Sequence, residues 1–248
     1  MDHLLYIAMS GAKENMNGIA VRANNLANTG TVGFKADFEQ ARAMQAFGEG
    51  LPTRVFSLTE RPGQNFDSGA LIITERELDM AIQGDGWFAV QDKDGNEAYT
   101  RAGNMQLSPT GMLLTASGLP VLGDDGPIQL PVPLAKMEIG QDGTVSARVQ
   151  GAPANVLEEV GRIKLVKPPY AEIEKGSDGL FRRKDGQIAE AAVDVSLLKG
   201  AIESSNVNAV GEMTYMISLQ RQFELQVKMM KSAEDMDSQQ NQLLRIVG

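Results

Sequence analysis

Apolar residues with helical spacing occur at both ends of this chain, and a different pattern occupies its middle. In the first 26 residues and again beyond residue 210, apolar side chains recur in steps of three and four. This spacing aligns side chains along one side of an α-helix, so it predicts one helix at each end. The residues of the N-terminal stripe are Leu5, Met9, Ala12, Met16, Ile19, Ala23 and Leu26.

The predicted C-terminal helix carries two apolar stripes on neighbouring faces, so we expect it to bind more than one partner surface. Ser204, Ser205 and Asn206 precede it and offer side-chain oxygens that could accept hydrogen bonds from its first turn. The first stripe consists of Met213, Met216, Phe223, Val227 and Met230, and the second of Leu225, Met229, Ala233, Met236, Leu243 and Val247.

The N-terminal helix is not expected to be stable alone. Burying its stripe contributes on the order of 10 kcal/mol, whereas ordering its backbone costs roughly 1 to 2 kcal/mol per residue. Gly11, Gly18 and several asparagines lower its helix propensity further. We therefore expect it to fold against a partner, with the C-terminal segment as the candidate. The sequence leaves open whether that segment belongs to the same chain or to a neighbouring copy.

The middle of the chain reads as a β-domain. Short β-rich runs alternate with six Asp-Gly pairs, which are typical turn signals. Residues 87–90 and 98–101 are predicted to form a hairpin, and residues 108–111 a turn between two further runs. Additional strands are expected at residues 128–130, 137–139, 144–149 and 162–166.

The stretch 29–68 shows neither period and contains five phenylalanines among several glycines and prolines. We expect an extended or conditionally ordered arm that is stabilised by another element or another chain. The predicted fold is therefore α+β. It comprises an N-terminal assembly helix (1–28), an extended arm (29–68), a central β-domain (69–198) and a C-terminal assembly helix (199–248).

Composition argues against most enzyme and binding classes. The 248 residues carry a net charge of −9, which disfavours binding to nucleic acid and to anionic lipid. The absence of cysteine and the presence of one histidine, His3, argue against thiolate chemistry, a Ser-His-Asp triad and a histidine metal site. No signal peptide or membrane span is expected. We expect no catalytic residue, cofactor or metal.

Two acidic patterns resemble sites but have simpler interpretations. Residues 92–96 read DKDGN like the start of a calcium loop, yet the glycine and glutamate expected at its sixth and twelfth positions are missing, so a turn is predicted. Glu75, Glu77 and Asp79 alternate and are predicted to lie on the solvent face of a strand.

One motif is far more specific. Residues 23–35 read ANNLANTGTVGFK, which resembles the signature near the N-terminus of bacterial flagellar rod and hook proteins. Residues 200–210, GAIESSNVNAV, resemble the element before the C-terminal helix of the same family, with Ile202 where leucine is usual. The segments 78–90, 99–104 and 111–118 resemble its β-domain, so the resemblance covers nearly the whole chain.

The resemblance implies a structural protein that leaves the cell through the flagellar type III export machinery and polymerises into the axial shaft that crosses the periplasm. Terminal helices of this family pack as an inner coiled-coil tube of copies and other rod proteins, and the β-domain faces outward. The assembled form is a helical oligomer without direct membrane insertion. Features such as Trp87 and Asn104 look most like a proximal-rod member, and a distal-rod member is the alternative.

The assembly interface implied by stripes and motifs together comprises the following residues: Leu5, Met9, Ala12, Met16, Ile19, Ala23, Asn24, Asn25, Leu26, Asn28, Gly33, Phe34, Ser205, Asn206, Val207, Met213, Met216, Phe223, Val227, Met230, Met236 and Leu243.

Two other classes compete with this interpretation. A secreted β-fold carbohydrate-active enzyme would use Trp87 as a stacking platform and Asp79 with Asp85 as a carboxylate pair. An adhesin-like binding module would function as a monomer without either terminal segment.

Overall fold

The computed structural model describes residues 2–39, 41–45, 55–59, 63–151, 153 and 157–247. The chain divides into two compact units. The helical unit comprises Met1–Thr29, Ala36–Asn65 and Val207–Gly248, and the β-unit comprises Gly30–Lys35 and Phe66–Asn206. Two long helices and a predominantly β middle confirm the predicted α+β class.

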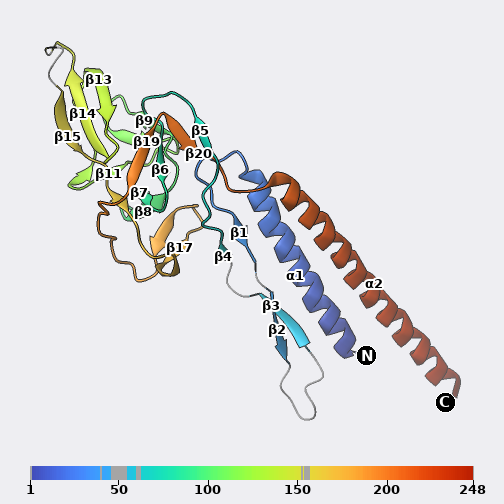
Figure 1. The fold of residues 1–248 in the computed structure, drawn as a ribbon. Helices are drawn as coiled ribbons and strands as arrows, with labels where there is room; N and C mark the ends of the chain where they lie inside the picture. The colour runs from blue at the N-terminus through green and yellow to red at the C-terminus, as the bar shows by residue number, and fades with distance from the viewer. Residues whose placement is uncertain are drawn as a thin grey trace. The chain divides into compact units, whose positions relative to one another are not determined.

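Helices α1 (Asp2–Ala27) and α2 (Ala209–Val247) lie side by side and antiparallel in the helical unit (Figure 1). The side-chain oxygen of Asn208 accepts a hydrogen bond from the backbone N–H of Gly211 at 3.1 Å and so caps α2. The predicted cap at residues 204–206 is therefore wrong. The Asn206 amide donates instead to the carbonyl of Asp67 at 2.9 Å, within the β-unit.

Four short strands belong to the helical unit and lie in the stretch 29–68, for which the sequence predicted no regular structure. They are β1 (Asp37–Phe38), β2 (Ala41–Gln45), β3 (Val55–Thr59) and β4 (Gly63–Gln64). β1 pairs with β4 and β2 with β3, both antiparallel, and β1 and β3 contact α1. Pairing of β1 with β4 and of β2 with β3 gives these weakly patterned residues a strand conformation. Residues 40, 46–54 and 60–62 of the predicted arm lie outside the described residues.

The largest sheet of the β-unit has five strands in the order β16-β7-β8-β18-β17. β7 (Trp87–Gln91) and β8 (Glu97–Thr100) form the predicted hairpin, and β9 (Met105–Leu107) and β10 (Leu113–Thr115) form the second predicted one. Asp92 accepts hydrogen bonds from the N–H groups of Asp94 and Asn96 at 2.9 and 2.8 Å, which confirms the predicted turn.

The remaining elements of the β-unit are short. They are β5 (Leu71–Ile73), β6 (Met80–Gln83), β11 (Leu122–Gly123), β12 (Gly126–Pro127), β13 (Leu134–Ile139), β14 (Thr144–Val149), β15 (Glu158–Arg162), β16 (Leu165–Val166), a 3-10 turn (Tyr170–Glu172), β17 (Ile173–Lys175), β18 (Phe181–Arg183), β19 (Ser196–Lys199) and β20 (Ala201–Glu203).

Two apolar clusters explain why β7 is apolar from Trp87 to Val90. Phe88 belongs to a cluster with Met80, Leu113 and Val145, whereas Trp87 belongs to another with Tyr99 and other residues of the five-stranded sheet. Successive side chains of a strand point to opposite faces. Both faces of β7 are therefore buried, and this position organises the core of the β-unit.

Three strand predictions need correction. The predicted strand 162–166 is divided between the end of β15 and β16, and Lys164 belongs to neither. The predicted strand 128–130 is reduced to an isolated bridge between Met112 and Gln129, because the flanking Pro127 and Pro131 lack the N–H that a ladder requires. Asp79 was placed on a solvent face, but it is 2% exposed and pairs with Asn104 in a second isolated bridge.

Over the residues that the structure describes, neither helix combines the length and apolar character needed to cross a bilayer.

Candidate assembly surface and its supporting polar clusters

The α1–α2 seam is built from small residues on α1. Gly11 lies beside Gln226 and Gly18 beside Leu219, where an added Cβ would come within 2.9 and 3.0 Å of those side chains. Ala8 and Ala12 of the same helix are also buried, 1% and 6% exposed, and α1 contacts β1 and β3 as well as α2. Small side chains let the two helices approach closely. The α2 residues that are buried or half-buried, among those described, recur in steps of three and four: Ala209, Glu212, Met216, Leu219, Phe223, Gln226, Met230 and Ala233.

Large apolar residues of α1 lie outside this seam. Leu5, Met9 and Met16 are 38%, 50% and 58% exposed, although their spacing of four and seven places them on one face. Of the predicted N-terminal stripe, Ala12 is buried, Ile19 and Leu26 are half-buried, and Ala23 is exposed. The contact with α2 thus leaves most of the large residues of the predicted stripe accessible to solvent.

The two predicted stripes of α2 are likewise partly buried in the seam and partly exposed. Met216, Phe223 and Met230 are half-buried in the seam, whereas Met213 and Val227 are 49% and 41% exposed. In the second stripe Ala233 is buried. The exposed members, Leu225, Met229 and Met236, are 59%, 46% and 49% exposed. The side chains of Leu243 and Val247 lie outside the described residues.

Asn25 is the buried centre of the Asn-rich motif, with 0% exposure. Its amide donates to the carbonyl of Asp37 at 2.7 Å and to Oε1 of Glu212 at 3.3 Å, and its oxygen accepts from the N–H of Asp37 at 2.9 Å. Arg22 donates to both oxygens of Glu212 at 3.1 and 3.2 Å and stacks over the Tyr215 ring at 4.7 Å. This Asn25 cluster ties α1, β1 and α2 together in one register.

The other asparagines of the motif end the helix. The amide of Asn28 donates to the carbonyl of Asn24 at 2.9 Å, and the Thr29 hydroxyl donates to the carbonyl of Leu26 at 2.9 Å. These bonds satisfy carbonyls of the last turn, which lack partners within the helix. Asn24 itself is exposed.

Gly33 has a structural requirement that the motif alone did not explain. Its φ is +69°, and an added Cβ would lie 2.3 Å from the carbonyl carbon of Arg101. Phe34, next in the chain, has the Lys175 ammonium 3.8 Å from its ring centroid, a cation–π contact within the β-unit.

Asn206, in the SNV element of the second motif, contacts Phe34 of the first motif. The Asn206 N–H donates to the carbonyl of Phe34 at 3.3 Å. Ser205, Asn206 and Val207 are all half-buried.

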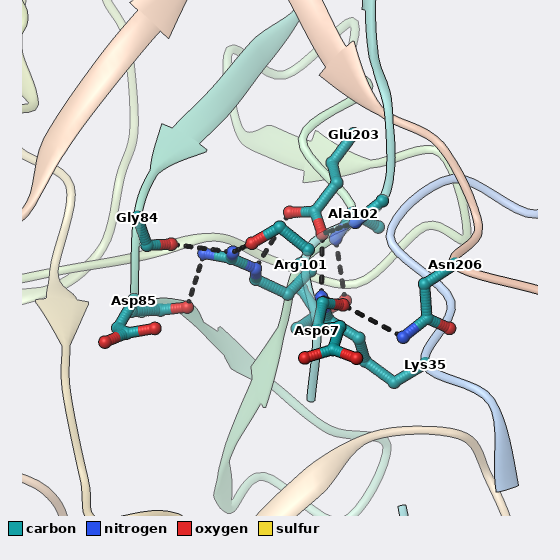
Figure 2. Close-up of polar contacts among 12 residues, drawn as sticks. Lys35, Asp67, Gly84, Asp85, Arg101, Ala102, Glu203 and Asn206 are labelled. Atoms are coloured by element: carbon teal, nitrogen blue, oxygen red, sulfur yellow. Dashed lines mark hydrogen bonds and ion pairs between the residues drawn. The ribbon is translucent and has the colours of Figure 1, made fainter. Parts of the chain in front are cut away.

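A buried ion cluster adds residues that were quoted in the motifs but not selected as functional. Lys35 Nζ lies 2.7 Å from Oε1 of Glu203, and Arg101 Nε lies 2.9 Å from Oε2 of the same carboxylate (Figure 2). Lys35 and Glu203 are each 1% exposed, and Arg101 is 4% exposed. Burial lowers the pKa of the Lys35 ammonium below its usual 10.5, and the hydrogen bond to Glu203 opposes that shift. A charged residue within each signature segment was the signal that could have identified them.

Of the three residues invoked by the enzyme alternative, Asp85 and Trp87 line one pocket, and Asp79 is not among the residues that line it. Trp87 is 2% exposed and packs against Phe181 with ring centroids 4.4 Å apart, so its faces cannot receive a sugar. Asp79 is likewise buried, and the Asp85 carboxylate accepts a hydrogen bond from the Tyr170 hydroxyl at 2.6 Å. Among the residues with described positions, no group of three acidic or histidine side chains could hold a metal ion.

Comparisons with known proteins identify the family to which the chain belongs. Three family descriptions match: "Flagella basal body rod protein" over residues 5–35, "Flagellar hook protein FlgE/F/G D1 domain" over residues 81–147, and "Flagellar basal body rod FlgEFG protein C-terminal" over residues 198–243. The flagellar basal-body rod protein FlgF of Escherichia coli is 44% identical, covering 98% of this chain and 99% of the relative. FlgF of Salmonella typhimurium is 42% identical with the same coverage.

The chain therefore belongs to the family of flagellar basal-body rod and hook proteins, the axial structural proteins of the flagellum. Within that family it is a rod subunit of the basal body, and the comparisons favour the FlgF type. A FlgG rod protein of Buchnera aphidicola is 32% identical over 96% of the chain, against 44% and 42% for the two FlgF relatives.

Proposed function

We propose that this rod subunit assembles through the large apolar side chains that its own α1–α2 contact leaves exposed. In this proposal residues 1–28 and 199–248 are the assembly helices, residues 29–68 the arm, and residues 69–198 an outward-facing domain. The supporting observation is that Leu5, Met9 and Met16 share one exposed face while small residues of the same helix contact α2.

The exposed residues of α2 form two separate faces. Val210, Met213 and Ile217 follow one another in steps of three and four near its start, and they are 73%, 49% and 55% exposed. Leu225, Met229 and Met236 form the other face. Exposed apolar patches of this kind mark interaction sites in soluble proteins. With one face on α1 and two on α2, each helical pair can contact several neighbours, which a helical tube requires.

The partners in this proposal are further copies of the chain and other rod proteins, packed as a coiled-coil tube. Burying each exposed Leu or Met side chain contributes roughly 1.5 to 3 kcal/mol before the costs of association. Many such contacts along a shaft would transmit torque through packing and would need no catalytic residue.

Two substitutions at exposed stripe positions test the proposal. Met16→Lys and Leu225→Lys place a charge where a neighbour would bury the side chain, at a cost of several kcal/mol. In a strain that lacks the native chain, we expect each variant to be at least tenfold depleted from purified basal bodies, measured by quantitative immunoblot. Motility should be lost with it.

The matched controls carry the same new charge one or three residues away. Asn17→Lys and Gln222→Lys change exposed polar positions and should assemble normally. All four purified monomers should retain native unfolding free energies within about 0.5 kcal/mol, because surface substitutions perturb the folded chain little. Normal incorporation of both stripe variants would contradict the proposed surface.

The family resemblance further supports export through the flagellar type III machinery and a position in the proximal rod within the periplasm. Export predicts that the chain stays in the cytoplasm when the flagellar export gate is deleted, which fractionation measures. The proximal position predicts that density for the β-unit appears in the proximal layer of the intact basal body. Its appearance only in the distal layer would favour the FlgG type.

A further inference from the structure

Four chain segments converge on one carboxylate inside the β-unit. Besides the contacts of its carboxylate with Lys35 and Arg101, Glu203 accepts a hydrogen bond at Oε1 from the N–H of Gly69 at 2.9 Å. The backbone carbonyl of Glu203 accepts another from the N–H of Gly33 at 2.8 Å. The segments that contain Gly33 and Lys35, Gly69, and Arg101 therefore meet at Glu203, and Figure 2 shows Lys35 and Arg101 beside its carboxylate.

Further bonds fasten these segments to one another and to the sheet. The Lys35 ammonium donates to the carbonyl of Asp67 at 2.8 Å, and the amide of Asn206 donates to that same carbonyl at 2.9 Å. The Arg101 guanidinium donates to the carbonyls of Gly86 and Gly84 at 2.9 and 2.8 Å. Arg101 thus connects the Glu203 carboxylate to the segment between β6 and β7.

Close backbone packing reinforces these polar contacts. An added Cβ at Gly69 would lie 1.9 Å from the carbonyl oxygen of Ser204. At Gly33 the corresponding approach to the backbone of Arg101 is 2.3 Å. Neither position can accept a larger residue without moving a neighbouring segment, so the segments are held at a fixed separation.

The position of the cluster along the chain gives it a wider consequence. The chain passes between the helical unit and the β-unit four times, after residues 29, 35, 65 and 206. Gly33, Lys35, Asp67 and Asn206 each lie within four residues of one of these passages. Any force carried by the backbone from the helices therefore enters the β-unit within four residues of the Glu203 cluster.

We propose that Glu203, Lys35 and Arg101 form a mechanical clamp, which holds the three connecting segments, residues 33–35, 67–69 and 203–206, in the β-unit so that none can be pulled out alone. The clamp's role under load rests on the proposed function as a torque-transmitting rod subunit. Its structural part, the joint fastening of these three segments, does not depend on assembly. Buried charges suit this role because breaking one partner is costly and their geometry is specific.

The variant Glu203→Gln tests the clamp in the full-length monomer. It keeps the size of the side chain but removes the charge that holds Lys35 and Arg101. Hydrogen exchange at Gly33, Gly69 and Asn206 should become at least tenfold faster. Amides of the β7–β8 hairpin should change less than twofold, because their bonds lie elsewhere in the sheet.

The matched control is Glu97→Gln, which neutralises a largely buried ion pair of the same β-unit. Lys164 Nζ lies 2.8 Å from Oε2 of Glu97, and no connecting segment takes part in that contact. This variant should leave exchange at Gly33, Gly69 and Asn206 unchanged. Unchanged exchange in Glu203→Gln, or equal acceleration across the whole β-unit, would overturn the clamp.

A second variant covers the case in which Glu203→Gln does not fold. Lys35→Met keeps the apolar stem and removes the ammonium, so it should accelerate exchange at Gly33 and Gly69 at least tenfold. If it leaves these amides protected, the clamp is wrong. In cells, either variant should swim at normal speed in dilute medium and lose at least half of its speed relative to Glu97→Gln in viscous medium.

These outcomes separate the clamp from the proposed function. Exchange in the monomer does not require assembly, so a failure there contradicts the clamp and leaves the assembly surface intact. Normal assembly of Met16→Lys and Leu225→Lys would contradict the assembly surface and leave the exchange result standing. Normal swimming of Glu203→Gln in viscous medium, despite faster exchange, would overturn the mechanical role.

Discussion

Replacing Asn25 by alanine should destabilise the helical unit more than any other single change within the Asn-rich motif. Asn25 is fully buried and makes two hydrogen bonds with the backbone of Asp37 and one, at 3.3 Å, with Glu212. Each bond to the backbone contributes about 0.5 to 1.5 kcal/mol net, and the long bond to the carboxylate adds about 0.5 kcal/mol. Alanine recovers roughly 0.5 kcal/mol through its higher helix propensity.

The expected loss is therefore about 2 kcal/mol, or roughly a thirtyfold change in the unfolding equilibrium. Urea denaturation of the full-length monomer, followed by circular dichroism at 222 nm, measures this loss of unfolding free energy through the unfolding of the helices. Asn24→Ala is the matched control, because Asn24 is exposed and its hydrogen bonds with Asn28 use only its backbone carbonyl. Equal unfolding free energies for the two variants would refute the assignment of Asn25 as the polar centre of the seam.

Three further predictions concern the β-unit and its pH dependence. Gly33→Ala should lower the melting temperature by several degrees, because the φ of Gly33 is +69° and the added Cβ would overlap a backbone carbonyl carbon. The control is Gly30→Ala, whose Cβ meets nothing within 4 Å and which should leave the melting temperature unchanged in calorimetry. The hydrogen bond from Arg182 holds the pKa of the Asp92 carboxyl below 3.8, so the stability that Asp92 contributes is present above that pH and lost as the pH falls through its folded pKa. Asp92→Asn should remove this part of the acid dependence in urea titrations between pH 6 and about pH 2.5. Burial raises the pKa of Tyr99 from 10.0 to about 12. The stability that the neutral Tyr99 hydroxyl contributes is therefore complete below pH 10 and is lost as the pH rises toward 12. Tyr99→Phe should reduce the loss of unfolding free energy between pH 10 and pH 12 in urea titrations, and an unchanged pH dependence would contradict this role of Tyr99.

Local sequence patterns predicted much of the fold. The steps of three and four at each end predicted α1 and α2, and the Asp-Gly turns predicted the β7–β8 hairpin, because helices and tight turns depend on residues close together in the chain. The strands β1–β4 escaped prediction, since their residues acquire a strand conformation only through pairing across the chain.

The assembly surface, too, could be predicted only in part from the sequence. The apolar stripes were visible in the sequence, but periodicity alone could not say which stripe α1 turns toward α2. The structure shows Gly11 and Gly18 in the seam and Leu5 and Met9 exposed, because close helix approach favours small side chains.

By itself the sequence determined the two helical ends, the β-rich middle and membership of the rod and hook family, through local spacing and contiguous motifs. The tertiary structure alone decided that Asn25 joins α1 to Asp37 and Glu212, and that Lys35 and Arg101 share the carboxylate of Glu203. Those partners are separated by up to 187 positions in the chain. Only the folded backbone brings them within hydrogen-bonding distance, so no local pattern could reveal their pairing.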